Sequence, residues 1–256
     1  MDGRVLPLAR ARAPSLAVAV RPRTLAAAAA AVAAAGLGYV LARETPLFAI
    51  QRIDVAGAPT DVEAQVRAAV APLRGRSLVG LDGNALLRRV AGLPTVLSAR
   101  YDRAFPHALR LVVRAERPVA VLRRGLGAWL VSARGRVIGS VGRRADPQLP
   151  RIWLPTGVAA DPGSILGERA GGLQARALGA ILATGFVPRI ATVTARGGAL
   201  VLALRNDVEL RLGRPESLRL KLMIARRVLP TLPSGTYLDV GVPERPVAGD
   251  QPSSLR

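Results

Sequence analysis

The sequence predicts an α+β protein with a single N-terminal transmembrane helix, a small domain of βααββ order, and a mixed β domain with flanking helices. Two observations predict this class. Residues 24–42 carry no charged side chain. Residues 48–242 then alternate between the two-residue hydrophobic period of strands and the 3.6-residue period of helices. The length of 256 residues fits one or two small domains beside the helix.

The composition excludes several kinds of active site. The chain has no Cys and one His, His107. Disulfides, thiolate nucleophiles and Cys-ligated metals are therefore absent, and so is any mechanism that needs two histidines. No phosphate loop, nucleophile elbow or paired metal-ligand spacing occurs in the sequence. We therefore expect no catalytic residue, no cofactor, no metal site and no small-molecule substrate.

The net charge of +20 invites a nucleic-acid interpretation, but its distribution argues against one. The cations are spread singly or in pairs, with no run of five like charges. The two Trp, three Tyr and three Phe are too few for a base-stacking platform. We expect no nucleic-acid partner and a solvated basic surface instead.

The uncharged segment 24–42 is long enough to cross a bilayer. Its 19 residues include ten Ala, and as a helix they extend about 30 Å. The preceding residues 1–23 hold five Arg and one Asp, which predicts a basic cytoplasmic tail. The later domains would then lie outside, as in a single-pass type II protein. Two alternatives remain open: a signal peptide cleaved near 33–35, and a soluble Ala-rich helix.

The segment 48–116 predicts two helices on one face of a three-stranded sheet. Thr60 and Glu63 have the spacing of a capping box, and Asp82 can cap the second helix. The last strand alternates clearly, and its pattern places Glu116 on the exposed face. The predicted strands are 48–55, 96–101 and 109–116.

The segment 117–242 predicts the mixed β domain. A hairpin is expected over 129–138, and a helix over 173–182. Three strands follow at 190–195, 199–204 and 208–212. Pro215 is expected at the start of an amphipathic helix. A last strand at 237–242 is stopped by Pro243, and residues 243–256 are expected to be a C-terminal tail.

One series of residues resembles a known family. The pattern is Arg103-x-x-Pro106-x-x-Leu109-x-Leu111-x-Val113-x-x-Glu116-Arg117-Pro118. It resembles the end of the POTRA domain in FtsQ/DivIB cell-division proteins. Leu210-x-Leu212-Gly213, Lys221-Leu222 and the segment 237–240 are similar to the β domain of the same family. Two positions depart from the family's pattern: His107 in a turn, and Ser132 where Asp is common.

The resemblance implies a function. It implies a bitopic scaffold of the bacterial divisome, located at the division septum. The implied partners are the coiled-coil proteins FtsB (DivIC) and FtsL, bound mainly through the C-terminal part of the β domain. If the last strand lies at a sheet edge, its free backbone groups can accept a partner strand. The candidate partner-binding residues are Tyr237, Leu238, Asp239, Val240, Gly241, Val242 and Pro243.

Two other functions remain as alternatives. A POTRA-bearing secretion or assembly component would bind unfolded substrates by strand addition. A secreted basic binding protein would arise if the N-terminal segment were cleaved. Both are binding proteins without catalytic residues, so they differ from the scaffold in topology and partner rather than in chemistry.

Overall fold

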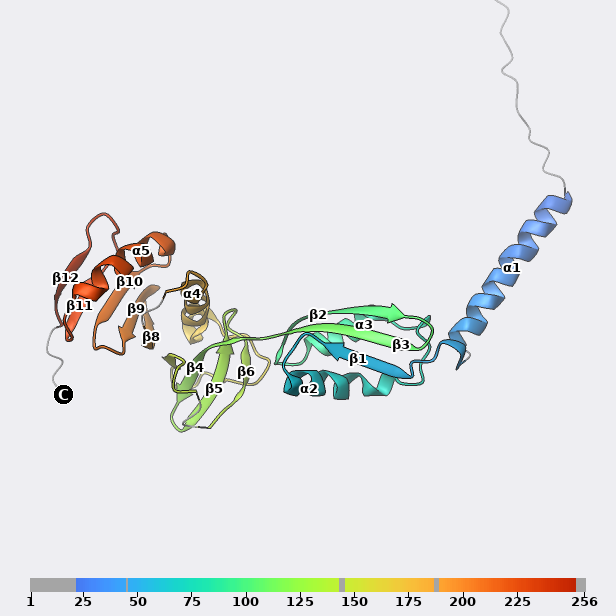
Figure 1. Ribbon diagram of the computed structural model, residues 1–256, viewed down its shortest axis with the longest axis horizontal. Helices are drawn as coiled ribbons and strands as arrows, with labels where there is room; N and C mark the ends of the chain where they lie inside the picture. Colours follow the sequence, from blue (N-terminus) through green and yellow to red (C-terminus); the bar gives the residue numbers. More distant parts are fainter. Residues whose placement is uncertain (1–21, 45, 143–145, 187–188, 252–256) are drawn as a thin grey trace, which may run out of the picture.

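A computed structural model describes residues 22–44, 46–142, 146–186 and 189–251. It has one long N-terminal helix followed by two α+β domains placed end to end (Figure 1). Each domain has its own hydrophobic core, one built from residues between 50 and 113 and the other from residues between 119 and 240.

Helix α1 spans Pro22–Glu44, and its apolar part is Arg23–Leu41. The many alanines favour a helix. Nothing in the described structure packs against its apolar side chains: Val32 is 73% exposed and Leu37 is 62% exposed. This is one helix long and apolar enough to cross a membrane, and it is not the buried core helix of a soluble domain. Residues 1–21 of the basic tail lie outside the described residues.

The first domain has the predicted βααββ order. Its elements are η1 (Pro46–Phe48), β1 (Arg52–Ala56), α2 (Thr60–Val70), η2 (Ala71–Leu73), α3 (Gly83–Ala91), β2 (Val96–Ala104) and β3 (Ala108–Ala115). Strand β3 lies in the middle of the sheet, parallel to β1 and antiparallel to β2. Both helices cover one face (Figure 1). Leu109, Leu111 and Val113 point into the core, as their alternation predicts.

The first strand begins later than predicted, at Arg52 rather than Phe48. Residues 48–50 instead pair with the loop that follows η2. The Ile50 N–H donates to the Arg76 carbonyl at 2.9 Å, and the Leu78 N–H donates to the Phe48 carbonyl at 2.8 Å. These bonds satisfy the backbone away from the sheet, so the apolar alternation there reflects burial of Ile50, which is 1% exposed.

The two predicted helix caps had different outcomes. The Asp82 cap is confirmed, because its Oδ1 accepts from the N–H groups of Asn84 (2.9 Å) and Ala85 (3.0 Å). The Thr60 capping box is wrong. The N-cap of α2 is Pro59, and no side chain caps that helix. Glu63 instead accepts from the Ala58 N–H at 3.4 Å.

The second domain is built on one nine-stranded sheet of order β12-β11-β10-β9-β8-β7-β4-β5-β6. Its elements are β4 (Pro118–Arg124), β5 (Gly127–Ser132), β6 (Val137–Ser140), β7 (Arg151–Trp153), η3 (Glu168–Ala170), α4 (Gly172–Ala183), β8 (Ile190–Arg196), β9 (Ala199–Leu204), β10 (Glu209–Gly213), α5 (Leu218–Val228), η4 (Leu229–Thr231), β11 (Thr236–Asp239) and β12 (Val247–Asp250). Helix α4 packs on β4, β5 and β8, and α5 packs on β10. The predicted hairpin, helix and three consecutive strands are confirmed within a few residues.

Two predictions in this domain are wrong. Helix α5 starts at Leu218, and its N-cap is Ser217 with a left-handed φ of 53°. Pro215 therefore lies in the preceding turn, outside the helix. The expected C-terminal tail contains a strand, because residues 247–250 fold back and pair antiparallel with β11.

The two residues that depart from the family's pattern are accommodated locally. His107 is half-buried, and its Nδ1 lies 3.3 Å from the Ala49 carbonyl oxygen. Ser132 is 1% exposed, and its hydroxyl has no hydrogen-bond partner within the described ranges. The turn is closed by backbone instead: the Gly135 N–H donates to the Ser132 carbonyl at 2.9 Å. The hairpin therefore forms without the family's Asp.

The junction between the domains overturns the expected exposure of Glu116. Its side chain is 3% exposed and forms an ion pair with Arg134 from the β5–β6 turn. Arg136 of the same turn donates to the carbonyl oxygens of Ala91 (3.1 Å) and Gly92 (3.4 Å), at the C-terminal end of α3. The alternation of β3 failed here because the second domain covers the end of that strand.

We expect Glu116→Gln to destabilise the protein by about 2 kcal/mol. Removing one partner of a fully buried ion pair costs about 3–5 kcal/mol, but Arg134 is 39% exposed, so water recovers part of that cost. The measurement is chemical denaturation of the detergent-solubilised chain. Glu168→Gln is the matched control, because Glu168 is 78% exposed in its pair with Arg176 and should contribute less than about 1 kcal/mol. Equal effects of the two changes would contradict the interpretation.

A second expectation concerns acid stability. The N–H groups of Ala85 and Asn84 lower the pKa of the Asp82 carboxyl. The ionised cap therefore stabilises the fold above the unfolded pKa, and this contribution is lost as pH falls through the folded pKa. In Asp82→Asn the protein should keep most of its stability at neutral pH, but the pH-dependent contribution of the cap should disappear. Asp82→Ala should remove the same pH-dependent contribution and also lower the stability at neutral pH, because no side chain then caps the helix. Thermal unfolding from neutral to acidic pH measures this, and an unchanged acid slope in the Asn variant would refute it.

Candidate partner-binding edge

The C-terminal edge of the large sheet is β12, not the strand expected from the sequence. Strand β11 lies between β10, to which it is parallel, and β12, to which it is antiparallel. The candidate residues 237–243 therefore form an interior strand and the turn that follows it. The free backbone groups of this edge belong to residues 247–250, and this exposed strand is the candidate site for adding a partner strand.

The turn between β11 and β12 is stabilised by two hydrogen bonds at its start. The Val240 N–H donates to the Arg211 carbonyl at 2.9 Å, which extends the pairing with β10. The Gly241 N–H donates to Asp239 Oδ1 at 2.8 Å. Gly213 has a φ of +64°, and a Cβ on it would lie 3.2 Å from the Gly241 Cα, so two glycines allow this close approach. These contacts direct the chain back along β11.

Lys221, the chain's only lysine, supports the same corner. It is 4% exposed, and its Nζ donates to the carbonyl oxygens of Leu212 (2.9 Å) and Arg214 (2.8 Å). A buried cation needs such partners to offset its loss of water. Lys221 thereby ties the end of β10 to α5, a role that the Lys221-Leu222 resemblance did not reveal.

The far end of β12 is held by Gln251. Its N–H donates to the Gly235 carbonyl at 2.9 Å. Its Nε2 donates to the carbonyl oxygens of Thr236 (2.9 Å) and Asp207 (3.1 Å). Both ends of this four-residue strand are therefore attached to the domain, so the edge is presented in an ordered form.

The hydrogen-bonding pattern determines which backbone groups of β12 are free. Because the Val240 N–H points to β10, the alternation of the strand turns the backbone of Tyr237 and Asp239 toward β12. Their partners Gly249 and Val247 point inward. The N–H and C=O groups of Ala248 and Asp250 then point away from the sheet. Two residues thus offer a partner strand both a donor and an acceptor.

One face beside this edge carries a compact polar and aromatic cluster. The Arg211 guanidinium lies 4.1 Å from the Tyr237 ring centroid, and its Nε lies 2.6 Å from Glu209 Oε1. Gly249 is paired with Tyr237, and a Cβ on Gly249 would lie 3.1 Å from the Tyr237 ring. The glycine therefore leaves room for the ring to lie across β12, and the pair packs as an aromatic residue over a small one.

The predicted partner-binding residues fall into two groups. Leu238 and Val240 are 1% and 0% exposed, so they belong to the core. The others are at least partly accessible: Tyr237, Asp239, Gly241, Val242 and Pro243. Val242 is 58% exposed, and Val247 at the start of β12 is 51% exposed. The sequence analysis missed β12, because Val-Ala-Gly-Asp contains one β-branched residue and resembles a loop.

The residues of the first-domain pattern have structural positions. Arg103 donates to the Leu81 carbonyl at 2.7 Å, and Pro106 lies in the turn between β2 and β3. Pro118 is the first residue of β4, directly after Arg117. This pattern therefore builds the first domain and its connection to the second, rather than a surface for a partner.

The fold thus defines a two-domain protein with a candidate membrane helix at one end and an open sheet edge at the other. Residues 120–242 match the family model described as "Cell division protein FtsQ/DivIB, C-terminal". This match supports an FtsQ/DivIB family protein and a role in cell division. A sequence search of curated proteins found no match. Strand β12 lies just beyond the matched residues.

The described residues contain no group of three or more acidic or His side chains that could hold a metal ion.

The edge geometry predicts opposite effects of proline at two nearby positions. Val240→Pro removes the N–H that pairs with Arg211, at a fully buried residue, and should destabilise the protein by more than about 2 kcal/mol. Ala248→Pro removes an outward N–H and should change stability by less than about 1 kcal/mol. Denaturation of the two variants measures this difference. Comparable destabilisation would show that the Ala248 N–H is used inside the sheet.

Proposed function

We propose that this protein is a bitopic, non-enzymatic scaffold of the bacterial divisome that binds a partner by adding a strand to β12. The observation that carries the proposal is an ordered, unpaired strand edge at the end of an FtsQ/DivIB domain. Such an edge supplies binding energy through backbone hydrogen bonds, and neighbouring side chains supply selectivity.

The proposed partners are the FtsB/DivIC-like and FtsL-like coiled-coil proteins implied by the family resemblance. The partner strand would pair with Ala248 and Asp250. Its side chains would then contact the exposed valines Val242 and Val247, and the Arg211–Tyr237 pair beside the edge. Aromatic and Arg side chains dominate many interfaces, so this pair is the expected source of selectivity.

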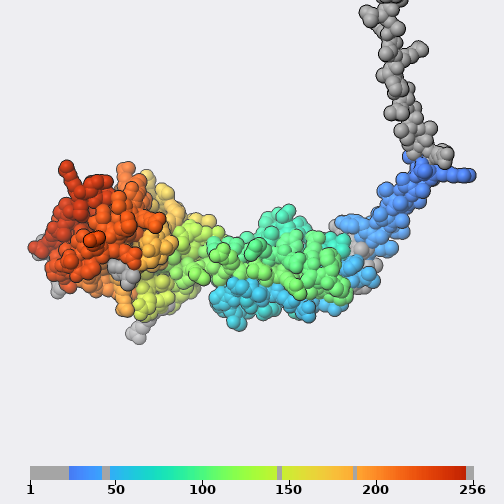
Figure 2. Space-filling view, turned by 45° about the horizontal axis from the view of Figure 1, so that its top comes forward, coloured from blue at the N-terminus to red at the C-terminus, as the bar shows by residue number. Residues whose placement is uncertain are grey.

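The proposed topology places the basic tail in the cytoplasm and both domains outside, as in a type II single-pass protein at the division septum. We further propose that residues 48–116 are a POTRA domain, because two helices cover one face of the sheet β1-β3-β2. Figure 2 shows the second domain, in yellow to red, at the end of the molecule far from α1, in blue. The scaffold would therefore present β12 to partners well away from the membrane surface.

A pull-down of coiled-coil division proteins on the full-length membrane protein tests the partner site. Ala248→Pro should reduce recovery by about tenfold, since one edge hydrogen bond is lost and the ring obstructs pairing. Ala248→Thr is the matched control, because it adds bulk and keeps the N–H, and it should bind nearly as well as the parent. Unchanged recovery by the Pro variant would move the contact away from this edge.

The cellular role predicts a location and a loss-of-function phenotype. A fluorescent fusion should concentrate at midcell, and depletion should give filamentous cells with incomplete septa. N-terminal sequencing of the membrane-extracted protein should return the intact tail, as expected for an uncleaved anchor. A uniform peripheral signal with normal division would refute the scaffold, and a new N-terminus after residue 33 would favour the secreted alternative.

A further inference from the structure

A cleft of about 450 Å³ lies in the first domain, at the end that joins α1. Its wall includes the loop after η2, and this loop pairs with residues 48–50, directly after α1 and η1. Gly75 donates to the Ile50 carbonyl at 2.9 Å, and Ala49 pairs with Ser77. Pairing to the first ordered residues after the helix places the cleft at the α1 end of the domain.

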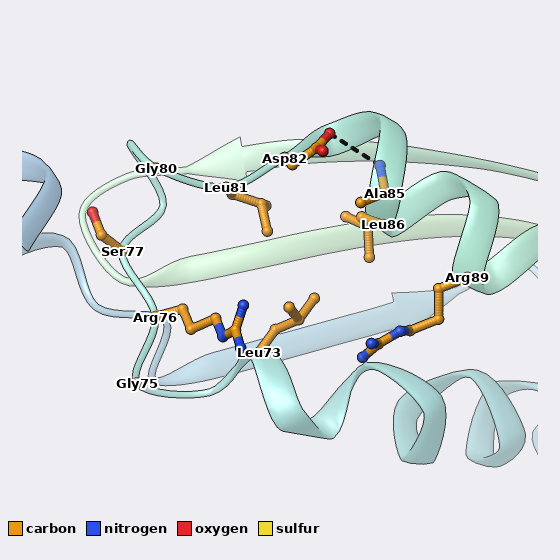
Figure 3. Close-up of a pocket in the computed structure, with 10 residues that line it drawn as sticks. All are labelled: Leu73, Gly75, Arg76, Ser77, Gly80, Leu81, Asp82, Ala85, Leu86 and Arg89. Carbon is orange, nitrogen blue, oxygen red and sulfur yellow. Dashed lines mark hydrogen bonds between the residues drawn. The ribbon is translucent and has the colours of Figure 1, made fainter.

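Two arginines reach into this cleft from different elements. Arg76 extends from the loop, and Arg89 extends from α3, so their guanidinium groups approach the same hollow from opposite sides (Figure 3). The floor between them is apolar and consists of Leu73, Leu81 and Leu86. Cationic groups above an apolar floor fit a ligand with an anionic head and an aliphatic body.

Neither arginine is neutralised within the part of the chain that the structure describes. Among the described residues, no ion pair or hydrogen bond involves the side chain of Arg76 or Arg89. Arg103, by contrast, is committed to the Leu81 carbonyl at 2.7 Å. Asp82 also lines the cleft and carries one negative charge, which its bonds from the N–H groups of Asn84 and Ala85 do not remove, against two positive charges from the arginines. The cleft therefore keeps a net positive charge.

Exposed apolar side chains lie at the same end of the domain. Leu47 of η1 is 67% exposed, and Phe105 in the β2–β3 turn is 55% exposed. The Phe105 ring packs edge-on against Phe48, with centroids 5.7 Å apart. Apolar and aromatic residues beside arginines are typical of surfaces that rest in the interfacial layer of a membrane.

We propose that this α1-proximal cleft binds the phosphate of an anionic phospholipid headgroup and thereby docks the first domain on the membrane surface. Arg76 and Arg89 hold the phosphate, the three leucines contact the glycerol and upper acyl carbons, and Leu47 and Phe105 enter the interface. Docking sets the tilt of the first domain relative to the membrane, and the junction at Glu116 passes this orientation to the second domain.

The short connection between α1 and the cleft favours a lipid phosphate over a phosphate free in solution. From Leu41, the last residue of the apolar span, to Phe48 the chain extends at most about 25 Å even when fully stretched. The cleft is thus held near a dense layer of headgroups at high effective concentration. Anionic headgroups in the leaflet that faces the cleft attract each nearby arginine over about a Debye length. The inference rests on the proposed membrane anchoring by α1.

The test uses the full-length protein in nanodiscs of phosphatidylcholine, with or without phosphatidylglycerol. The natural sequence has no Cys, so Asn84→Cys in α3 gives a single site for a fluorophore beside the cleft. A headgroup-nitroxide lipid quenches the fluorophore when the domain docks. We expect stronger quenching in the phosphatidylglycerol discs, weakened by salt, and no such change for a fluorophore at Ser140→Cys in β6.

Variants distinguish binding in the cleft from a general attraction between the basic protein surface and the anionic membrane. Arg76→Gln and Arg89→Gln should each lower the docked-to-free ratio by about fivefold. Arg100→Gln and Arg114→Gln are matched controls, because they remove the same charge from exposed positions on the uncovered face of the sheet, and they should have little effect. Equal quenching in the two kinds of disc, or equal losses in both pairs of variants, would overturn the proposal. Failure to incorporate into discs would instead refute the membrane anchor.

Discussion

The ion pair between Glu116 and Arg134 is the contact on which the arrangement of the two domains depends. It joins the end of β3 in the first domain to the β5–β6 turn of the second. The Glu116 carboxylate is almost completely buried, so it needs the Arg134 guanidinium to compensate its charge. Removing Arg134 would leave that buried negative charge uncompensated. Arg136 strengthens the same junction by donating to the last carbonyl groups of α3. Side chains from one turn thereby hold both domains in one orientation.

This junction fixes the orientation of the second domain relative to the first. The chain passes from β3 to β4 through Glu116 and Arg117 alone, so the connection has little freedom of its own. Helix α1 at one end, the first domain, and the open edge of the large sheet at the other end form one extended body (Figure 1). The junction therefore sets the orientation of the open edge of β12 relative to α1.

Most regular elements were predictable from local patterns, and the errors lie at helix starts and at the junction between the domains. The periods of β3, α3 and the three strands after α4 follow directly from their side chains, as does the Asp82 cap. The errors at Thr60 and Pro215 concern helix starts, because the N-caps of α2 and α5 are Pro59 and Ser217. The error at Glu116 arose because Arg134 of the neighbouring domain pairs with its carboxylate. Two-residue alternation reports which side of a strand is buried within its own domain, and it carries no information about a second domain that covers its end.

The sequence by itself determined the apolar helix, the order of elements and the two cores, because periodic burial of apolar side chains is encoded locally. Only the tertiary structure decided which strand is the edge. Val247–Asp250 has weak strand propensity, and it forms β12 because it pairs with β11. The turn at Gly241 and the bond from Gln251 to Thr236 hold the chain on either side of this strand. The same holds for the cleft: Arg76 and Arg89 are 13 positions apart in the sequence, and folding alone brings their charges to one hollow.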